Sequence, residues 1–260
     1  MLGTIMENLT HYPVLVFAAA FILLSGASIA GAWLHRRYPN ITDEHKDDLS
    51  VILAATLTLL ALIIGFSFSM ATERYDQRKN FEEAEANAIG TELLRADLLP
   101  PDNAARVRKL LGDYLDQRIL FYINKDEAER ARIDQRTGQL QGELWAAVRG
   151  PAVAQQTPVT ALAIAGMNDV LNSQGYTQAA YWNRIPAAAW CLLAAIALCC
   201  AVLLGYRARH PRRLVFVLPL VVSVSLLLIA DIDAPRHGLI QVSPQSLQSL
   251  AKSMGRSGPE

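Results

Sequence analysis

The chain has 260 residues, of which 52% are hydrophobic and 18% charged, and its formal net charge is zero. This composition is too apolar for an ordinary soluble domain. Balanced charge, with no Lys/Arg block interleaved with aromatic residues, argues against a nucleic-acid partner. The three cysteines, Cys191, Cys199 and Cys200, lie inside one apolar run, so they predict buried thiols rather than a disulfide framework or a metal site.

Four apolar runs predict two hairpins of transmembrane helices. Pro13 to Trp33 and Val51 to Met70 are long enough to cross a hydrocarbon core of ~30 Å. Ala187 to Leu204 and Leu214 to Ala230 are near the lower limit of ~17 residues, and either could instead be a buried core helix. The linker between these last two runs is only GYRARHPRR, which favours a hairpin of spans.

The first run also has an alternative reading as a secretory signal peptide, because Ser28-Ile29-Ala30 resembles a cleavage site. Residues 1–12 contain Glu7 but no Lys or Arg, whereas a signal peptide begins with a positively charged region. We therefore expect a retained membrane anchor. Small residues four apart in this run permit another helix to approach closely; they are Gly26 with Ala30 and Ala27 with Gly31.

The second span organises the rest of the chain, because it passes without a proline or a turn cluster into a charged helix. We predict an all-α protein with four transmembrane helices, a helical extramembrane layer and a symmetric oligomeric state. The expected segments are 1-48 (first transmembrane helix and loop), 49-99 (second transmembrane helix and its extramembrane continuation), 100-186 (helical extramembrane region), 187-230 (third and fourth transmembrane helices) and 231-260 (largely irregular tail).

Within the extramembrane region, Pro100-Pro101-Asp102 predicts the end of one helix and the start of another, with Asp102 as N-cap. A stripe at i, i+3 and i+4 predicts a buried face; it comprises Val107, Leu110, Leu111, Tyr114, Leu115 and Ile119. Lys125 to Val148 is predicted to be a charged helix with sparse apolar positions, a mostly solvated arm that ends at Gly150-Pro151. Thr157-Pro158 predicts a further helix start, with Gly175 as a candidate interruption of that helix.

The side of the membrane that carries residues 71–186 stays open. Basic residues in the short loops favour a cytoplasmic position for those loops; they are Arg36, Arg37, Lys46, Arg207, Arg209, Arg212 and Arg213. A second group at the boundaries of the extramembrane region has the opposite effect; it comprises Arg74, Arg78, Lys79 and Arg184.

Enzymatic signatures are absent from the sequence: there is no GxSxG, P-loop, GxGxxG or HExxH, so we expect no enzyme, no cofactor and no metal. Asp231 and Asp233 are the one carboxylate pair at a membrane boundary. They could help to bind a cation, but a solvated turn before Pro235 is the favoured interpretation. Glu82, Glu83 and Glu85 cannot all share one helical face, which argues against a carboxylate metal site there.

A sharper hypothesis concerns the second span. Thr58, Leu62 and Phe66 lie at i, i+4 and i+8, and Met70 and Glu73 extend this stripe towards the polar end. If several copies surrounded an axis, the stripe would form an apolar constriction with an acidic ring below it, and such rings favour cations. Ordinary helix packing by Leu62 and Phe66 is the interpretation that periodicity alone favours.

Three segments resemble a known family. The run GFSFSMATERYDQR, residues 65–78, resembles the second helix of bestrophins, in which a Gly-Phe pair is followed eight residues after the Phe by Arg and an aromatic residue. EAEANAIG, residues 83–90, and DIDAPRHGLI, residues 231–240, resemble more closely the bacterial bestrophin-like family of four-span membrane proteins. The matched order of spans and motifs covers most of the chain.

The resemblance implies an oligomeric ion channel, a homo-pentamer in the bacterial inner membrane, whose partners are lipids, its own copies and inorganic ions. It places the pore neck on Thr58, Leu62 and Phe66, the positions below the neck on Met70 and Glu73, and the membrane boundary at Arg74-Tyr75. The alternative function is a non-conducting scaffold or sensor that binds a partner through its helical layer.

Several features depart from the bestrophin pattern. Thr58 is polar where the family is usually apolar, and Glu73 would oppose anions, which most bestrophins conduct. The acidic run of the bestrophin calcium clasp does not follow the fourth span, so calcium gating is not implied. Bestrophins also keep the helical region cytoplasmic, against the charge bias of the short loops.

Overall fold

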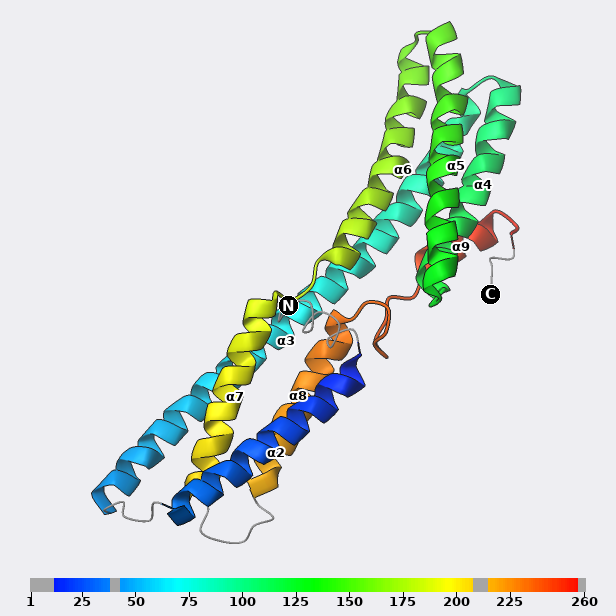
Figure 1. Ribbon diagram of the computed structural model, residues 1–260. Coiled ribbons are helices and arrows are strands. Elements are labelled where there is room, and N and C mark those ends of the chain that lie inside the picture. The colour runs from blue at the N-terminus through cyan, green and yellow to red at the C-terminus, as the bar shows by residue number, and fades with distance from the viewer. Residues whose placement is uncertain (1–11, 38–42, 208–214, 257–260) are drawn as a thin grey trace. The chain divides into compact units, whose positions relative to one another are not determined.

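The computed structural model describes residues 12–37, 43–207 and 215–256, and no strand occurs among them, which confirms the all-α class. Two compact units contain the helices (Figure 1). The first, here called the apolar unit, comprises Met1–Tyr75 and Arg184–Gln241. The second, here called the polar unit, comprises Asp76–Asn183 and Val242–Glu260. Glu7, Pro39 and the basic residues Arg209, Arg212 and Arg213 lie outside the described residues.

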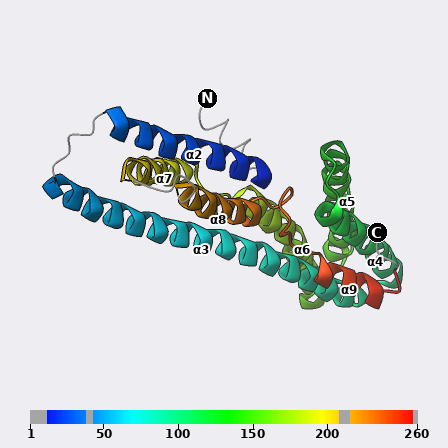
Figure 2. The ribbon, with the colours of Figure 1, turned by 90° about the horizontal axis from the view of Figure 1, so that it is seen from below.

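The apolar unit contains α2 (Pro13–Arg37), the first part of α3 (Asp43–Arg95), α7 (Ala187–Arg207) and α8 (Val217–Asp233). Helix α2 packs against both α7 and α8 (Figure 2). Glycines allow α2 and α7 to approach each other closely. A Cβ on Gly31 would overlap the carbonyl oxygen of Val202, and one on Gly205 would overlap that of Ser28. The predicted close approach is therefore found at Gly31, whereas Gly26 faces open space.

Within the part of the chain that the structure describes, three stretches are long and apolar enough to cross a membrane by length and composition: Pro13–Arg37, Asp47–Leu98 and Pro158–Arg207. They contain the first three predicted spans. The fourth predicted span, Leu214 to Ala230, overlaps α8 but is shifted from it: Leu214 lies outside the described residues, and α8 continues to Asp233. The 17 residues of α8 correspond to about 25 Å of helix. This length is a few ångströms less than a typical hydrocarbon core of ~30 Å.

The second span and its charged continuation form one helix, α3, of 53 residues. Its polar portion joins η1 (Ala96–Leu98), α4 (Pro101–Ile123), α5 (Glu127–Ala154), α6 (Pro158–Trp182) and α9 (Gln245–Ser253) in the polar unit. The predicted stripe of α4 is buried in the core of this unit. Asp102 is not the N-cap of α4, since Pro100 holds that position and Asp102 lies in the first turn.

The solvated arm predicted at residues 125–148 is wrong. Helix α5 buries one side, which carries Ile133, Thr137, Leu140, Leu144 and Val148 at spacings of three or four residues. These apolar positions are sparse but lie on one face, and that suffices to pack α5 against α4 and α6. The predicted break at Gly150-Pro151 is also wrong, because α5 continues through Pro151 to Ala154.

Helix α6 begins as predicted at Thr157, whose hydroxyl accepts a hydrogen bond from the Thr160 N–H (3.1 Å). Gly175 does not interrupt it. The tail is more ordered than expected, since it contains α9, which buries Leu247 and Ala251 in the polar unit. The Glu82 carboxylate accepts hydrogen bonds from the first turn of α9, at Ser246 N (2.9 Å) and Leu247 N (3.0 Å).

Candidate functional site

The predicted neck residues lie on the side of α3 that faces away from the core of the apolar unit. Leu62 and Phe66 are 52% and 61% exposed, and Thr58 is exposed as well. The buried residues of this part of α3 are Leu53, Leu60, Ser67 and Ala71. At about 100° per residue, the two sets are about 160° apart around the helix. The stripe therefore takes no part in the buried core of its own unit.

The polar character of Thr58 is reduced by its own helix. Its hydroxyl donates a hydrogen bond to the Ala54 carbonyl (2.9 Å), so the donor is satisfied within α3. Further along the stripe, Met70 is half-buried and Glu73 is exposed. Thr58 thus departs less from an apolar neck than its residue type implies, whereas Glu73 presents its charge to the surroundings.

Arg74 and Tyr75 follow directly. Tyr75 packs against the core of the apolar unit and is the last residue of α3 that belongs to it. Arg74 is half-buried, and its buried Nε and Nη1 have no hydrogen-bond partner among the described residues. Helix α3 thus leaves the apolar unit directly after this pair.

The solvated turn predicted at Asp231 and Asp233 is wrong, because both side chains are buried. The Asp231 carboxylate accepts hydrogen bonds from Leu239 N (2.6 Å) and Ile240 N (2.9 Å). The Asp233 carboxylate accepts two from Ile185 N (3.1 and 3.2 Å), and Arg184 Nε lies 3.6 Å from it. Backbone amides thus bind both carboxylates, and Arg184 lies close to Asp233. The two carboxylates hold neighbouring segments against the end of α8.

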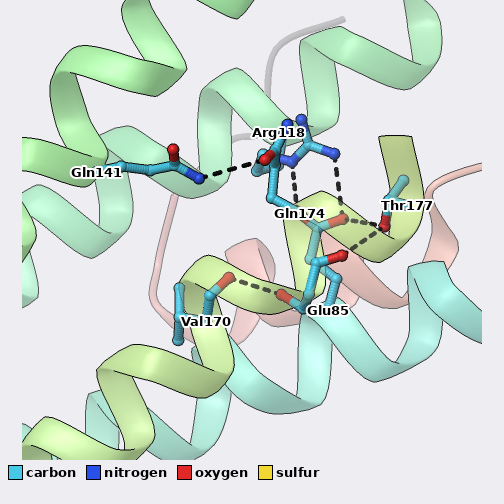
Figure 3. Close-up of polar contacts among 7 residues, drawn as sticks. Glu85, Arg118, Gln141, Val170, Gln174 and Thr177 are labelled. Carbon is cyan, nitrogen blue, oxygen red and sulfur yellow. Dashed lines mark hydrogen bonds and ion pairs between the residues drawn. The ribbon is translucent and has the colours of Figure 1, made fainter. Parts of the chain in front are cut away.

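Glu85, in the motif at residues 83–90, forms a buried ion pair with Arg118 of α4 that sequence reasoning missed (Figure 3). The Glu85 carboxylate binds the Arg118 guanidinium through Nε and through Nη2 (3.3 Å), and Thr177 Oγ1 donates to the same carboxylate (3.1 Å). The Arg118 guanidinium also lies over the Phe121 ring, 4.4 Å from its centroid. The one signal in the sequence is an arginine on the buried stripe of α4.

Electrostatics keep Arg118 charged at this site. Burial alone would lower the pKa of Arg118. The negative charge of Glu85, its hydrogen bond to the guanidinium and the nearby Tyr114 and Tyr122 together outweigh this effect, and the pKa lies above its ordinary value. Burial, reinforced by Glu85, raises the pKa of the Tyr114 and Tyr122 hydroxyls, so both phenols stay neutral. The ion pair therefore joins α3 to α4, and Thr177 of α6 binds the same carboxylate.

Glu92 is a further buried carboxyl on α3, besides Glu82 and Glu85. No described residue forms a hydrogen bond with either of its oxygens, and its side chain lies against Gly166 of α6, where a Cβ would overlap it. Burial raises the pKa of Glu92 to about 8, with the nearby Arg95 opposing the rise and Asp169 adding to it. At neutral pH the Glu92 side chain is therefore mostly protonated.

Among the residues that the structure describes, no three His, Cys, Asp or Glu side chains group as metal ligands. The described histidines belong to other contacts. The His35 ring packs against Tyr206 and the His237 ring against Tyr12, with centroids 5.1 and 5.2 Å apart. The exposed stripe of α3 has no structural role within its own unit.

The order of the helices and the apolar stretches together define the class: an all-helical membrane protein. The sequence profile of the Bestrophin-like domain family matches residues 21–247, and the chain therefore belongs to this family. No curated protein matches the chain. Membership of the family and the fold indicate a membrane ion channel in general and are consistent with a protein that is not an enzyme.

Solved structures show the same fold. A bacterial bestrophin homologue from Klebsiella pneumoniae matches with a TM-score of 0.61 and 14% identity, over 94% of this chain and 98% of that one. A tryptophan-to-alanine variant of a bacterial bestrophin homologue from the same organism matches with a TM-score of 0.61 and 14% identity, over 91% of this chain and 97% of that one. A structure described as a membrane protein matches with a TM-score of 0.63 and 14% identity, over 92% of this chain and 99% of that one.

Proposed function

We propose that the protein is an oligomeric ion channel of the bacterial inner membrane, a pentamer by its resemblance to bestrophins. Its neck is formed by Thr58, Leu62 and Phe66 from each copy. The observation that carries the proposal is the position of this stripe: large apolar side chains are exposed opposite the buried face of α3. Around a symmetry axis they would form an apolar constriction, which gates ions by dewetting.

The residues after the neck set the charge of the pathway. Met70 and Glu73 follow Phe66 along the stripe, and Glu73 is exposed. A ring of Glu73 carboxylates would attract cations and repel anions. We therefore propose a preference for cations, in contrast to most bestrophins.

Conductance of the reconstituted protein in planar bilayers tests the neck. Leu62→Ala and Phe66→Ala widen the constriction and make it less hydrophobic, so each is expected to raise single-channel conductance or open probability. Phe68→Ala is the matched control, because Phe68 is 40% exposed on the same helix but about 160° from Phe66. A purified oligomer that conducts neither as wild type nor as either neck variant would contradict the proposal.

A second candidate function, a non-conducting scaffold or sensor, is favoured by a different observation. An open groove of about 870 Å³ lies between α3 and α9 in the polar unit. Side chains able to hydrogen-bond with a partner segment line it, among them Asn87, Thr91, Ser249 and Ser253. In this case Phe66 would pack sideways between copies and the neck substitutions would leave ion flux at zero.

A further inference from the structure

The segment that follows α8 is held in one conformation by a set of hydrogen bonds. Leu239 N and Ile240 N donate to the Asp231 carboxylate (2.6 and 2.9 Å). The Gln241 side-chain amide donates to the carbonyls of Arg236 (2.8 Å) and Gly238 (2.7 Å). Gly238 lies so close to the Asp231 carbonyl that a Cβ would overlap it. The chain therefore returns to the last turn of α8 and is fixed there.

This fixed turn exposes apolar side chains. Leu239 is 95% exposed and Ile240 is 38% exposed. They continue a stripe, because the outward face of α8 carries Leu220, Val224 and Leu228 at i, i+4 and i+8, all of them exposed. Asp231 is three residues beyond Leu228 on the same side of the helix, and it is the residue that holds Leu239 and Ile240. The turn thus extends the apolar stripe of α8.

The position of the turn along the spans indicates the partner. The turn lies beside Asp231, in the last turn of α8, at the end of an apolar helix of about 25 Å. His237, in the same turn, packs against Tyr12, which directly precedes the first residue of α2. Exposed tyrosines at the ends of apolar helices are typical of the membrane–water interface. The turn therefore lies at the level where two spans meet the lipid headgroups.

We propose that the Leu239–Ile240 turn is a lipid anchor: its side chains insert between the headgroups and the acyl chains beside the last turn of α8, where Asp231 interrupts the apolar stripe of that helix. Asp231 is the positioning residue, because its carboxylate holds both backbone amides and leaves the side chains free to enter the bilayer. The anchor goes beyond the proposed channel function and does not depend on conduction.

Lipid contact at Leu239 can be measured with a fluorophore. Leu239→Cys, in a chain whose Cys191, Cys199 and Cys200 are alanine, is labelled with an environment-sensitive dye and reconstituted into phosphatidylcholine vesicles. Lipids brominated near the glycerol end of the acyl chain are expected to quench its emission at least twofold. Leu94→Cys is the matched control, since this leucine of the polar unit is 74% exposed, and we expect no quenching there.

A shielded dye at position 239 that brominated lipid does not quench would overturn the proposal and indicate contact with a second copy. A dye that emits as in water would overturn it as well. Leu239→Asn in the natural sequence provides a test without labels. It is expected to lower the melting temperature in phosphatidylcholine vesicles, because it removes an apolar side chain from the bilayer. Leu94→Asn, at the exposed position in the polar unit, is expected to leave the melting temperature nearly unchanged. An equal effect of the two substitutions would also contradict the anchor.

Discussion

Glu85 of α3 and Arg118 of α4 form an ion pair whose side chains are both completely buried in the polar unit. Removing two charges from water is costly, and the cost is repaid only when the pair is well hydrogen-bonded. Thr177 on α6 supplies a further donor to Glu85, and the ring of Phe121 covers the guanidinium. The pair therefore joins three helices at one point of the core.

Breaking this pair is expected to destabilise the polar unit strongly. Glu85→Gln keeps the size of the side chain but leaves the Arg118 charge unpaired in the interior. The expected loss in the free energy of unfolding is about 3–5 kcal/mol. Arg132→Gln is the control, because it breaks the exposed Glu129–Arg132 pair (3.0 Å), and such surface pairs contribute about 1 kcal/mol or less. Denaturant unfolding followed by circular dichroism measures both, and similar losses would contradict the assigned role.

Glu92 predicts a pH dependence of stability. Its pKa in the folded protein is raised from 4.5 to about 8, mainly by burial. A raised pKa means that the folded state holds the proton more tightly than the unfolded state. The stabilisation is complete below pH 4.5 and is lost as the pH rises through 8.

The melting temperature of the wild type is therefore expected to fall between pH 7 and pH 9. Glu92→Gln mimics the protonated form and is expected to remove most of this decrease, whereas Glu83→Gln, at an exposed position of the same helix, is expected to retain it. If the wild type and Glu92→Gln respond equally to pH, Glu92 is not the responsible group.

The glycines of the apolar unit carry a third prediction. Gly205→Ala places a methyl group against the Ser28 backbone, which cannot move away without shifting α2 from α7. Overpacking of this kind costs about 1–3 kcal/mol. Gly26→Ala is the matched control, because nothing lies within 4 Å of its Cβ position. Melting temperatures in one detergent separate the two, and a decrease of the same size for Gly26→Ala would contradict the packing argument.

The features that sequence reasoning predicted are those that depend on local pattern. An unbroken run of helix-forming residues predicts α3, and the spacing of Thr58, Leu62 and Phe66 predicts a common stripe on that helix. The exposure of this stripe is consistent with the pore hypothesis, which stays a prediction until symmetry-related copies are observed. Hydrophobic periodicity likewise predicts the buried face of α4.

The features that it missed depend on partners far away in the sequence. Glu82 binds the first turn of α9 across 164 and 165 positions, and the Glu85–Arg118 pair spans 33. The sequence relates both glutamates only to the geometry of their own helix. It predicts solvated side chains for Asp231 and Asp233, because acidic residues are usually exposed. The backbone amides that bind them belong to segments whose return to α8 has no local signature in the sequence.

The charge selectivity of the proposed channel depends on Glu73. If this carboxylate forms a ring below the neck, Glu73→Gln removes one negative charge per copy, five in a pentamer. The cation-to-anion permeability ratio is then expected to fall several-fold, because acidic rings raise the local concentration of cations. Reversal potentials under a tenfold salt gradient measure this ratio. Asp102→Asn, at an exposed position of α4, is the control and is expected to leave the potential unchanged. An unchanged reversal potential in Glu73→Gln, together with altered conductance in Phe66→Ala, would retain the neck and exclude Glu73 as the selectivity ring.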